Sequence, residues 1–274
     1  MKTFHTLLLI SLLGLWACGG DTEETAMDQG GVEEEDGTLI GSGNPNNDAI
    51  TLTDMPPTED FPNASIDDWS YDAGTFNYTI SGGYTLGRQT DDASSVMCAN
   101  SDKGQHIHLI IDNEPYIAKY EPTFNQPMTN GEHYLLTFLS RSYHQSIKTD
   151  KAHRAVKASV NNNSFSNPQP ITEPMLFYSR PKGTYTGKAE TENVMLDFYP
   201  VNAPLGDEYQ VKASVNGKEF MIDEWKAYYL KGLPMGENTI TLTLMAGDSI
   251  VDAPLNPVVR TFTLQELPTE AAGK

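Results

Sequence analysis

The stretch YQVKASVNGKEFMID, residues 209–223, decides the fold. Two short runs that contain β-branched and aromatic side chains flank the dipeptide Asn216-Gly217. Asn-Gly between such runs is the strongest short-range signal for a β-hairpin, because both residues readily adopt positive φ angles. This part of the chain is therefore predicted to form two antiparallel strands joined by a two-residue turn.

Strand signals of the same kind recur along the chain, whereas helical periodicity is nearly absent. Each run is short, is enriched in aromatic and β-branched residues, and is flanked by Gly, Pro, Asn or Asp. Many short strands at this spacing predict an all-β protein made of antiparallel, immunoglobulin-like sandwiches. The expected strands are residues 76–80, 106–111, 133–139, 194–199, 209–215, 239–244 and 258–264.

The two halves of the chain are similar to each other. In both, a strand and a hairpin lead to an aromatic-rich segment, a Gly-Glu pair and an apolar strand, so that Asn113 aligns with Asn216 and Gly131 with Gly236. We interpret this as the duplication of one sandwich of roughly 95 residues. The polar, proline-containing stretch 161–174 is the expected linker. The predicted sandwich domains are residues 65–163 and 174–266, followed by a C-terminal tail, 267–274.

The first residues indicate export. An apolar core at residues 7–15 follows Lys2; it is too short to span a bilayer and has the length of a signal-peptide core. The core ends at Leu15-Trp16-Ala17-Cys18, and this order of apolar core, small residue and cysteine resembles the lipobox of bacterial lipoproteins. The resemblance implies removal of residues 1–17, acylation of Cys18 and a lipid anchor in the cell envelope, on the periplasmic or surface face of the outer membrane.

Charge separates a tether from the body of the protein. The chain has a net charge of −19, and residues 19–64 hold twelve acidic residues and no Lys or Arg. A segment of this composition buries too little apolar surface to offset its ordering entropy, so residues 18–64 are expected to be a disordered tether. The acidic chain has no domain-wide basic face, which argues against binding to nucleic acid.

Catalytic motifs are missing. The sequence has no G-x-S-x-G, H-E-x-x-H, P-loop or G-x-G-x-x-G motif. Once Cys18 is lipidated, Cys98 has no disulfide partner, and a buried small side chain is the expected role for it. A Cys–His pair would need a lowered thiol pKa, and nothing around Cys98 predicts a helix N-terminus that would lower it. We therefore expect a protein that is not an enzyme.

Histidines are confined to the first half. In a strand, His106 and His108 project to the same face, roughly 6.5–7 Å apart, and His133 opens a strand that could reach the same rim. Two or three imidazoles from adjacent strands would suit zinc or copper, and Met97 and Cys98 would add soft ligands. The alternative is that these rings only form local hydrogen bonds. The second half has no histidine, so the sandwich itself does not require them.

A basic loop follows in the same half. Residues 141–157 hold five Lys or Arg residues and one acid, whereas the corresponding loop of the second half has no basic residue. Arg forks and hydroxyl donors in such a loop could hold a phosphate or carboxylate group. The alternative is a solvated loop that moderates self-repulsion. The candidate ligand-binding residues are Arg141, Ser142, His144, Lys148, His153 and Arg154.

The first half also resembles a small family of uncharacterised bacterial envelope domains with His-x-His-Leu and a downstream Gly-x-His. The matching positions are His106, His108, Leu109, Asp112, Gly131 and His133. It is similar, too, to lipoproteins described as phosphopeptide-binding, and that resemblance implies a role for the basic loop.

Taken together, the expected function is non-catalytic binding of an anionic, phosphorylated or carboxylated ligand or peptide by the first sandwich of a membrane-anchored protein, without a cofactor. An anionic peptide or protein is the expected partner. The alternative is a zinc- or copper-binding protein that uses His106, His108 and His133. A folded structure separates the two hypotheses by showing which of these side chains converge.

Overall fold

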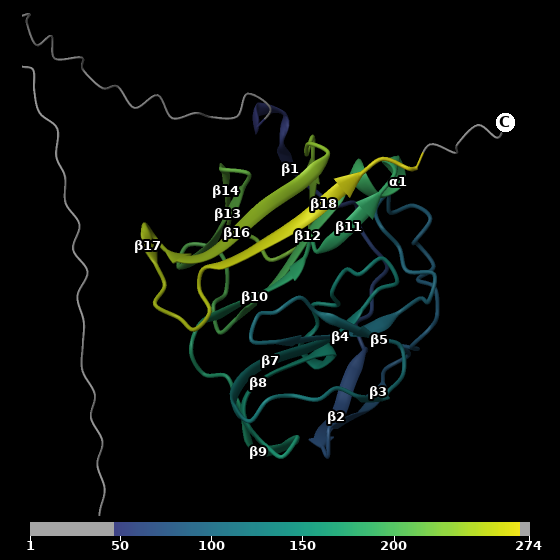
Figure 1. The fold of residues 1–274 in the computed structure, drawn as a ribbon, viewed down its shortest axis with the longest axis vertical. Helices are drawn as coiled ribbons and strands as arrows, with labels where there is room; N and C mark the ends of the chain where they lie inside the picture. The colour runs from purple at the N-terminus through teal and green to yellow at the C-terminus, as the bar shows by residue number, and fades with distance from the viewer. Residues whose placement is uncertain (1–46, 269–274) are drawn as a thin grey trace, which may run out of the picture. The chain divides into compact units, whose positions relative to one another are not determined.

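The computed structural model of the protein describes residues 47–268, and strands account for most of this span (Figure 1). The predicted signal segment and Cys18 lie outside the described residues. Three short helical elements interrupt the strands: η1 (Asn47–Ala49), η2 (Asp150–Ala152) and α1 (Lys188–Thr191). Within residues 47–268, no helix is both long enough and apolar enough to cross a bilayer.

The first sandwich packs a three-stranded sheet against a five-stranded sheet. The smaller sheet has the order β2-β3-β6 and contains β2 (Ser65–Asp72), β3 (Thr75–Ser81) and β6 (Thr123–Asn125). The larger sheet has the order β5-β4-β7-β8-β9 and contains β4 (His106–Ile111), β5 (Ile117–Lys119), β7 (Gly131–Ser140), β8 (His153–Asn161) and β9 (Ser164–Pro170). Side chains that alternate along these strands form the first core, in which Ile66, Phe76 and Leu109 are fully buried.

The second sandwich has a four-stranded and a six-stranded sheet. The former has the order β1-β15-β12-β10 and contains β1 (Thr51–Asp54), β10 (Met175–Arg180), β12 (Val194–Val201) and β15 (Tyr228–Lys231). The latter has the order β11-β18-β16-β13-β14, with β17 paired to β16, and contains β11 (Gly183–Thr186), β13 (Tyr209–Val215), β14 (Lys218–Ile222), β16 (Gly236–Ala246), β17 (Ser249–Ile250) and β18 (Val258–Gln265). Val215 pairs with Lys218 across Asn216-Gly217, which confirms the predicted hairpin.

Both sandwiches have the same basic strand order, which confirms the prediction of two tandem immunoglobulin-like folds. With β1, β9, β11 and β17 set aside as additions, the first, second and fifth strands of each unit form one sheet, and the third, fourth, sixth and seventh form the other. Strand β4 corresponds to β13, and β7 corresponds to β16. Strands β7 and β16 begin at Gly131 and Gly236, the two glycines aligned in the sequence.

Two predicted boundaries are wrong. Residues 47–64 are not part of an unstructured tether, because β1 pairs with β15 of the second sandwich and Ile50 is fully buried in the second core. Residues 164–170 are not a linker either, because they form β9 at the edge of the first sandwich. Edge strands tolerate polar residues and proline, since one side of the strand needs no hydrogen-bond donor. Composition alone therefore missed both strands.

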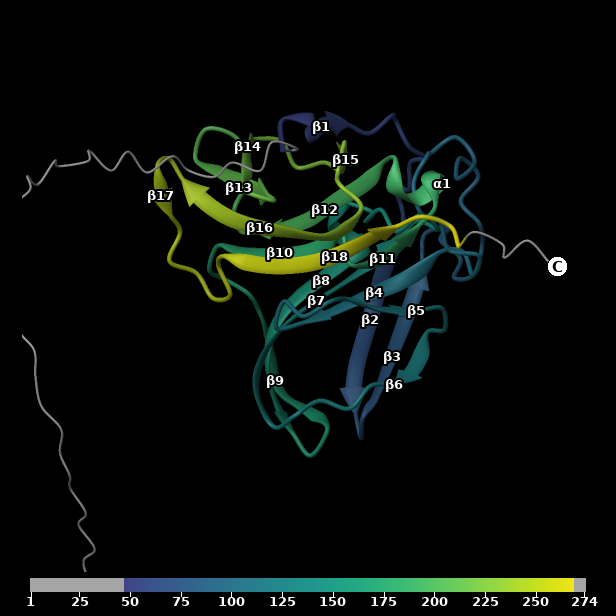
Figure 2. The same ribbon diagram turned by 45° about the horizontal axis from the view of Figure 1, so that its top comes forward.

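The two sandwiches share a third core. On the face of β4 and β7 that points away from the first core, Ile110 and Phe138 are fully buried against Phe177 and Tyr199 of the four-stranded sheet. In Figures 1 and 2, β10 accordingly runs beside the sheet that contains β7 and β8. The five-stranded sheet is thus covered on both faces around these residues, and the polar side chains of β4 that share this face with Ile110 are buried between the sandwiches.

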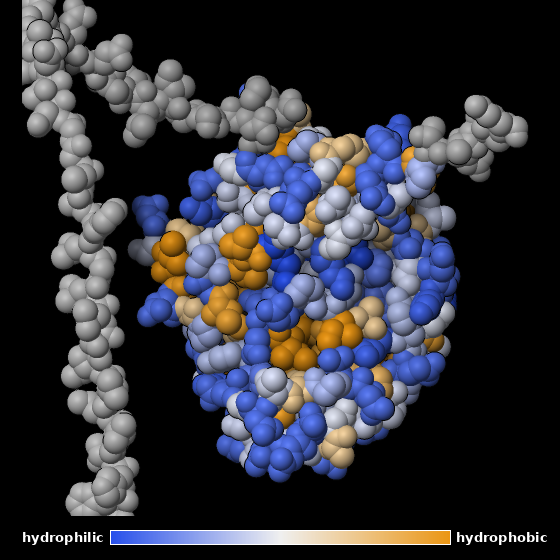
Figure 3. Space-filling view, viewed as in Figure 1, coloured by the Kyte–Doolittle hydropathy of each residue, from blue (hydrophilic) through white to orange (hydrophobic). Residues whose placement is uncertain are grey.

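The outer surface in Figure 3 is mostly hydrophilic, as the acidic composition predicts. Apolar patches lie over β17 and the start of β18, where Ile250 and Val259 are more than half exposed. Scattered apolar side chains of this kind are common on folded proteins and do not mark a site by themselves.

Candidate metal centre

The His-x-His pair lies on β4 with both rings on the face that packs against the second sandwich. Residues two apart in a strand share a face, so His106 and His108 project together, while Ile107 between them enters the first core. The ring of His108 packs on that of Phe138, a member of the third core, with 4.8 Å between centroids. Both imidazoles are fully buried. The strand pleat therefore places two ring nitrogens between the sandwiches.

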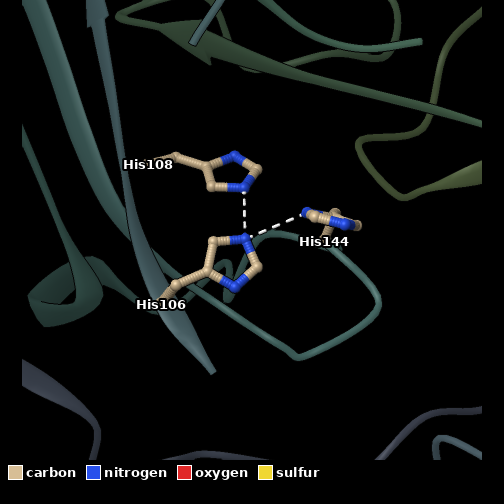
Figure 4. Close-up of side chains that lie close together, drawn as sticks. All are labelled: His106, His108 and His144. Atoms are coloured by element: carbon tan, nitrogen blue, oxygen red, sulfur yellow. Dashed lines mark hydrogen bonds between the residues drawn. The ribbon is translucent and has the colours of Figure 1, made fainter. Parts of the chain in front are cut away.

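A third histidine reaches the same point from the turn after β7. The backbone N–H of His144 donates to the carbonyl of Arg141 over 2.9 Å. Its φ of 70° lies in the left-handed region, which is uncommon for residues other than glycine. Nε2 of His106 lies 2.8 Å from Nε2 of His108 and 3.0 Å from Nδ1 of His144 (Figure 4). The potential ligand atoms of the three rings all lie within 4.8 Å of one another.

Hydrogen bonds alone do not account for this arrangement. Nδ1 of His106 lies 2.8 Å from the carbonyl oxygen of Gly104, which can only accept, so Nδ1 carries the proton and Nε2 of the neutral ring keeps a single lone pair. Nitrogens of both His108 and His144 approach that one lone pair. A lone pair accepts one straight hydrogen bond, whereas a metal ion among the rings would use a separate lone pair from each.

Burial keeps the three rings neutral. It lowers the pKa of His106 to about 4, even though the hydrogen bond to Gly104 opposes the shift. It also holds the pKa of His108 and that of His144 well below the usual 6.5. The nearby positive charge of Arg180 acts in the same direction on all three rings. Neutral imidazole is the form that binds metals, so the site is ready to accept an ion at neutral pH.

No model of a known protein family and no curated protein matches the chain. Among solved structures, the fibronectin(III)-like modules of Clostridium thermocellum CbhA are 14% identical, with a TM-score of 0.27, over 34% of this chain and 100% of that chain. A 1.5-MDa bacterial ice-binding adhesin is 8% identical, with a TM-score of 0.22, over 80% of this chain and 64% of that chain.

The surface protein SGBP-B of the Bacteroides ovatus mixed-linkage glucan utilization locus is 10% identical, with a TM-score of 0.21, over 79% of this chain and 70% of that chain. Similarity at these values does not indicate a ligand for the present chain. Any ligand has to be argued from the site itself.

His133 lies on the opposite face of the five-stranded sheet from His106 and His108. The prediction that His133 binds a metal ion together with them is therefore wrong. Along β7, His133 shares a face with Leu135, which belongs to the first core. Its Nδ1 lies 2.5 Å from a carboxylate oxygen of Asp112. His133 therefore forms a pair of its own, away from the other histidines.

The structure does not bring the six predicted anion-binding residues together, and the three Lys and Arg side chains among them bind acceptors within the chain. Arg141 donates from Nε to the carbonyl of Glu59 over 3.0 Å, and the same carbonyl accepts from its Nη2. Lys148 donates to Asp197 over 2.7 Å. Arg154 donates to the backbone carbonyl of Ile66. These three cationic side chains thus bind other segments of the chain rather than an outside anion.

The other three candidates for that site have three different surroundings. Ser142 accepts a hydrogen bond from the N–H of Thr90 over 3.2 Å. His153 packs against the ring of Tyr199, with 5.1 Å between centroids. His144 joins the histidine cluster. The six residues predicted to bind an anion therefore have no common point.

Met97 and Cys98 do not belong to the histidine cluster. Met97 is 64% exposed. Cys98 is a free cysteine, and burial raises its pKa to about 12, which keeps the thiol protonated at neutral pH. A protonated thiol is a weak nucleophile and a poor metal ligand. The arrangement can therefore offer three imidazole nitrogens to an ion, without help from sulfur.

Proposed function

We propose that the protein is a lipid-anchored, non-catalytic binding protein of the bacterial cell envelope that binds a transition-metal ion through His106, His108 and His144. The observation that supports this most strongly is the approach of two further imidazole nitrogens to the single free lone pair of His106. Imidazole nitrogen suits zinc, copper and nickel rather than magnesium or calcium.

The spacing of the rings favours copper(II) over zinc. Neighbouring ligands of a square-planar ion with bonds of about 2.0 Å lie about 2.8 Å apart, whereas ligands of tetrahedral zinc lie about 3.3 Å apart. His106 lies 2.8 and 3.0 Å from its two neighbours. The centroids of His108 and His144 are 5.9 Å apart, compared with 4.7 Å from each of them to His106. This pattern suits a square-planar ion in which His106 is the neighbour of both other ligands, and His108 and His144 bind on opposite sides of the ion.

The proposed location in the cell envelope is supported by the sequence. The lipobox-like segment ending in Cys18 implies export and acylation, and the acidic residues that follow it would hold the body away from an anionic membrane surface. An anionic peptide or protein partner has less support, because Arg141, Lys148 and Arg154 are engaged within the chain.

Metal titration of the purified full-length protein in detergent tests the proposal. After treatment with a chelator, the protein is titrated with Cu²⁺ and with Zn²⁺ by calorimetry, and bound metal is counted by mass spectrometry. We expect one copper ion per chain, bound more tightly than zinc, as the general affinity order of divalent ions also favours. His144→Ala should weaken copper binding at least tenfold.

His153→Ala is the matched control, because His153 follows in the same half of the chain but packs on Tyr199 rather than on the cluster. This variant should bind copper as the wild type does. An absence of copper binding, or an equal loss in both variants, would refute the proposed site.

A further inference from the structure

The proposed metal site contains no negatively charged ligand. Among the described residues, its three potential ligands are the rings of His106, His108 and His144, and no Asp, Glu or Cys side chain joins the cluster. Neutral ligands leave the whole charge of a bound ion uncompensated, and a buried charge without an opposite partner is costly. The site therefore favours an ion of low charge.

Two cations lie close to the cluster and add to this effect. Arg180 is 6% exposed and donates from Nη2 to the hydroxyl of Tyr116 over 2.8 Å, and that oxygen lies 3.4 Å from Nδ1 of His144. Lys182 donates to the backbone carbonyl of Tyr116 over 2.6 Å. Within residues 47–268, neither cation forms an ion pair with a carboxylate. Two positive charges near the site are thus left without a negative partner.

The electrostatic field of these cations reaches the three rings. Burial is the main cause of the low pKa values of the three histidines, and the positive charges of Arg180 and Lys182 lower those values further. A field that opposes a proton on a ring also opposes a metal ion beside it. Because Coulomb energy is proportional to charge, this repulsion is twice as large for a divalent ion as for a monovalent ion at the same place.

The hydrogen-bond partners of the rings have the same consequence. A histidine that binds a metal usually donates its other N–H to a carboxylate, a carbonyl or a water molecule, which makes the ring a stronger ligand. Nδ1 of His106 has only the neutral carbonyl of Gly104, and among the described residues Nδ1 of His108 is buried with no hydrogen-bond partner. Neither ring is strengthened by a negative charge, so both suit an ion that withdraws little electron density.

We propose that the site binds copper(I) more tightly than copper(II), so that the protein holds copper in its reduced form. Copper(I) carries one charge instead of two and is stable with fewer ligands. Copper(II) favours four ligands in a plane, of which the described residues supply three. Copper enters the site as copper(I), and the protein transfers no electron. This inference rests on the proposed copper site.

Competition measurements on the full-length protein in detergent test the preference. The affinity for copper(I), kept reduced with ascorbate in the absence of oxygen, is measured against the coloured chelator bathocuproine disulfonate. The affinity for copper(II) is measured by calorimetry with glycine as the competitor. We expect copper(I) to bind at least tenfold more tightly, and a tenfold ratio of affinities corresponds to about 59 mV in the reduction potential of the bound ion.

Lys182→Met removes one positive charge near the site without removing a ligand. The variant should bind copper(II) more tightly, and the ratio of copper(I) to copper(II) affinity should fall at least threefold. Lys157→Met is the matched control, because it removes the same charge from an exposed ion pair with Glu132. Solvent screens a charge at that position, so the ratio should stay at the wild-type value.

Binding of copper(II) that is as tight as that of copper(I) in the wild type overturns the proposed preference, and this measurement needs no variant if Lys182→Met does not fold. A wild-type ratio in Lys182→Met also overturns it. Failure of the wild type to bind copper in either oxidation state overturns the metal site itself.

Discussion

Lys148, in the loop after β7, and Asp197, on β12, form an ion pair that joins the two sandwiches, with 2.7 Å between Nζ and Oδ1. The carboxylate of Asp197 is fully buried and also accepts hydrogen bonds from the N–H and the hydroxyl of Ser146. Lys148, which the sequence analysis assigned to an anionic ligand, is thus paired with a carboxylate of the protein itself.

Removing the cation of this pair should destabilise the fold. Lys148→Met leaves the Asp197 carboxylate buried without a positive partner, and breaking a buried pair in this way typically costs about 3–5 kcal/mol. Urea unfolding measures the change. Lys157→Met, which removes an exposed partner of Glu132, should have little effect. An equal change in both variants would show that the buried pair has no special role.

Strand β1 should contribute to the stability of the second sandwich, although β1 precedes the first sandwich in the sequence. Ile50 is fully buried in the second core, so Ile50→Ala should lower the free energy of unfolding by about 2–5 kcal/mol. Thr51→Ala, at an exposed neighbouring position, should change it little. A stability of Ile50→Ala that matches the wild type would mean that β1 is not docked in solution.

Metal-free protein should lose stability in mild acid. Folding lowers the pKa of His106 from 6.5 to about 4 because burial disfavours the charged ring. Between these two pKa values the unfolded state binds more protons than the folded state. The contribution of the neutral His106 ring to the free energy of unfolding is therefore fully present above about pH 6.5 and is lost as the pH falls to about 4. Thermal unfolding across this range should show the fall, and His106→Gln should reduce its slope. An unchanged slope in the variant would contradict the shift.

The pair formed by His133 and Asp112 should have the opposite pH dependence. Burial opposes protonation of His133, but the Asp112 carboxylate and the Thr129 carbonyl outweigh it and raise the pKa of His133 above 6.5. This contribution is therefore fully present below about pH 6.5 and is lost as the pH rises through the raised pKa. NMR titration of the His133 ring should give the raised value, and Asp112→Asn should abolish the rise. A ring that titrates below 6.5 in the wild type would refute the pairing.

The features predicted correctly from the sequence depend on neighbouring residues. Turn chemistry at Asn216-Gly217 is local, as is the alternation that places His106 and His108 on one face of β4. Repetition of the same local pattern in both halves predicted two sandwiches of the same design. These features needed no knowledge of how distant segments pack.

The features predicted wrongly depend on tertiary packing. His144 meets the His-x-His pair only because β7 lies beside β4 and ends at the turn that carries it. His133 is excluded because its position along β7 gives it the other face, and a change of one residue in a strand reverses the face of every side chain. The partner of β1 is β15, far along the chain, so no local signal could reveal it.

X-ray absorption spectroscopy of the copper-loaded full-length protein tests the central claim most directly, because scattering from imidazole rings counts the bound histidines. We predict three imidazoles in the wild type and in His133→Ala, and two in a His144→Ala sample that is saturated with copper. Fewer than three imidazoles in the wild type, or a loss of one in His133→Ala instead of His144→Ala, would contradict the site formed by His106, His108 and His144.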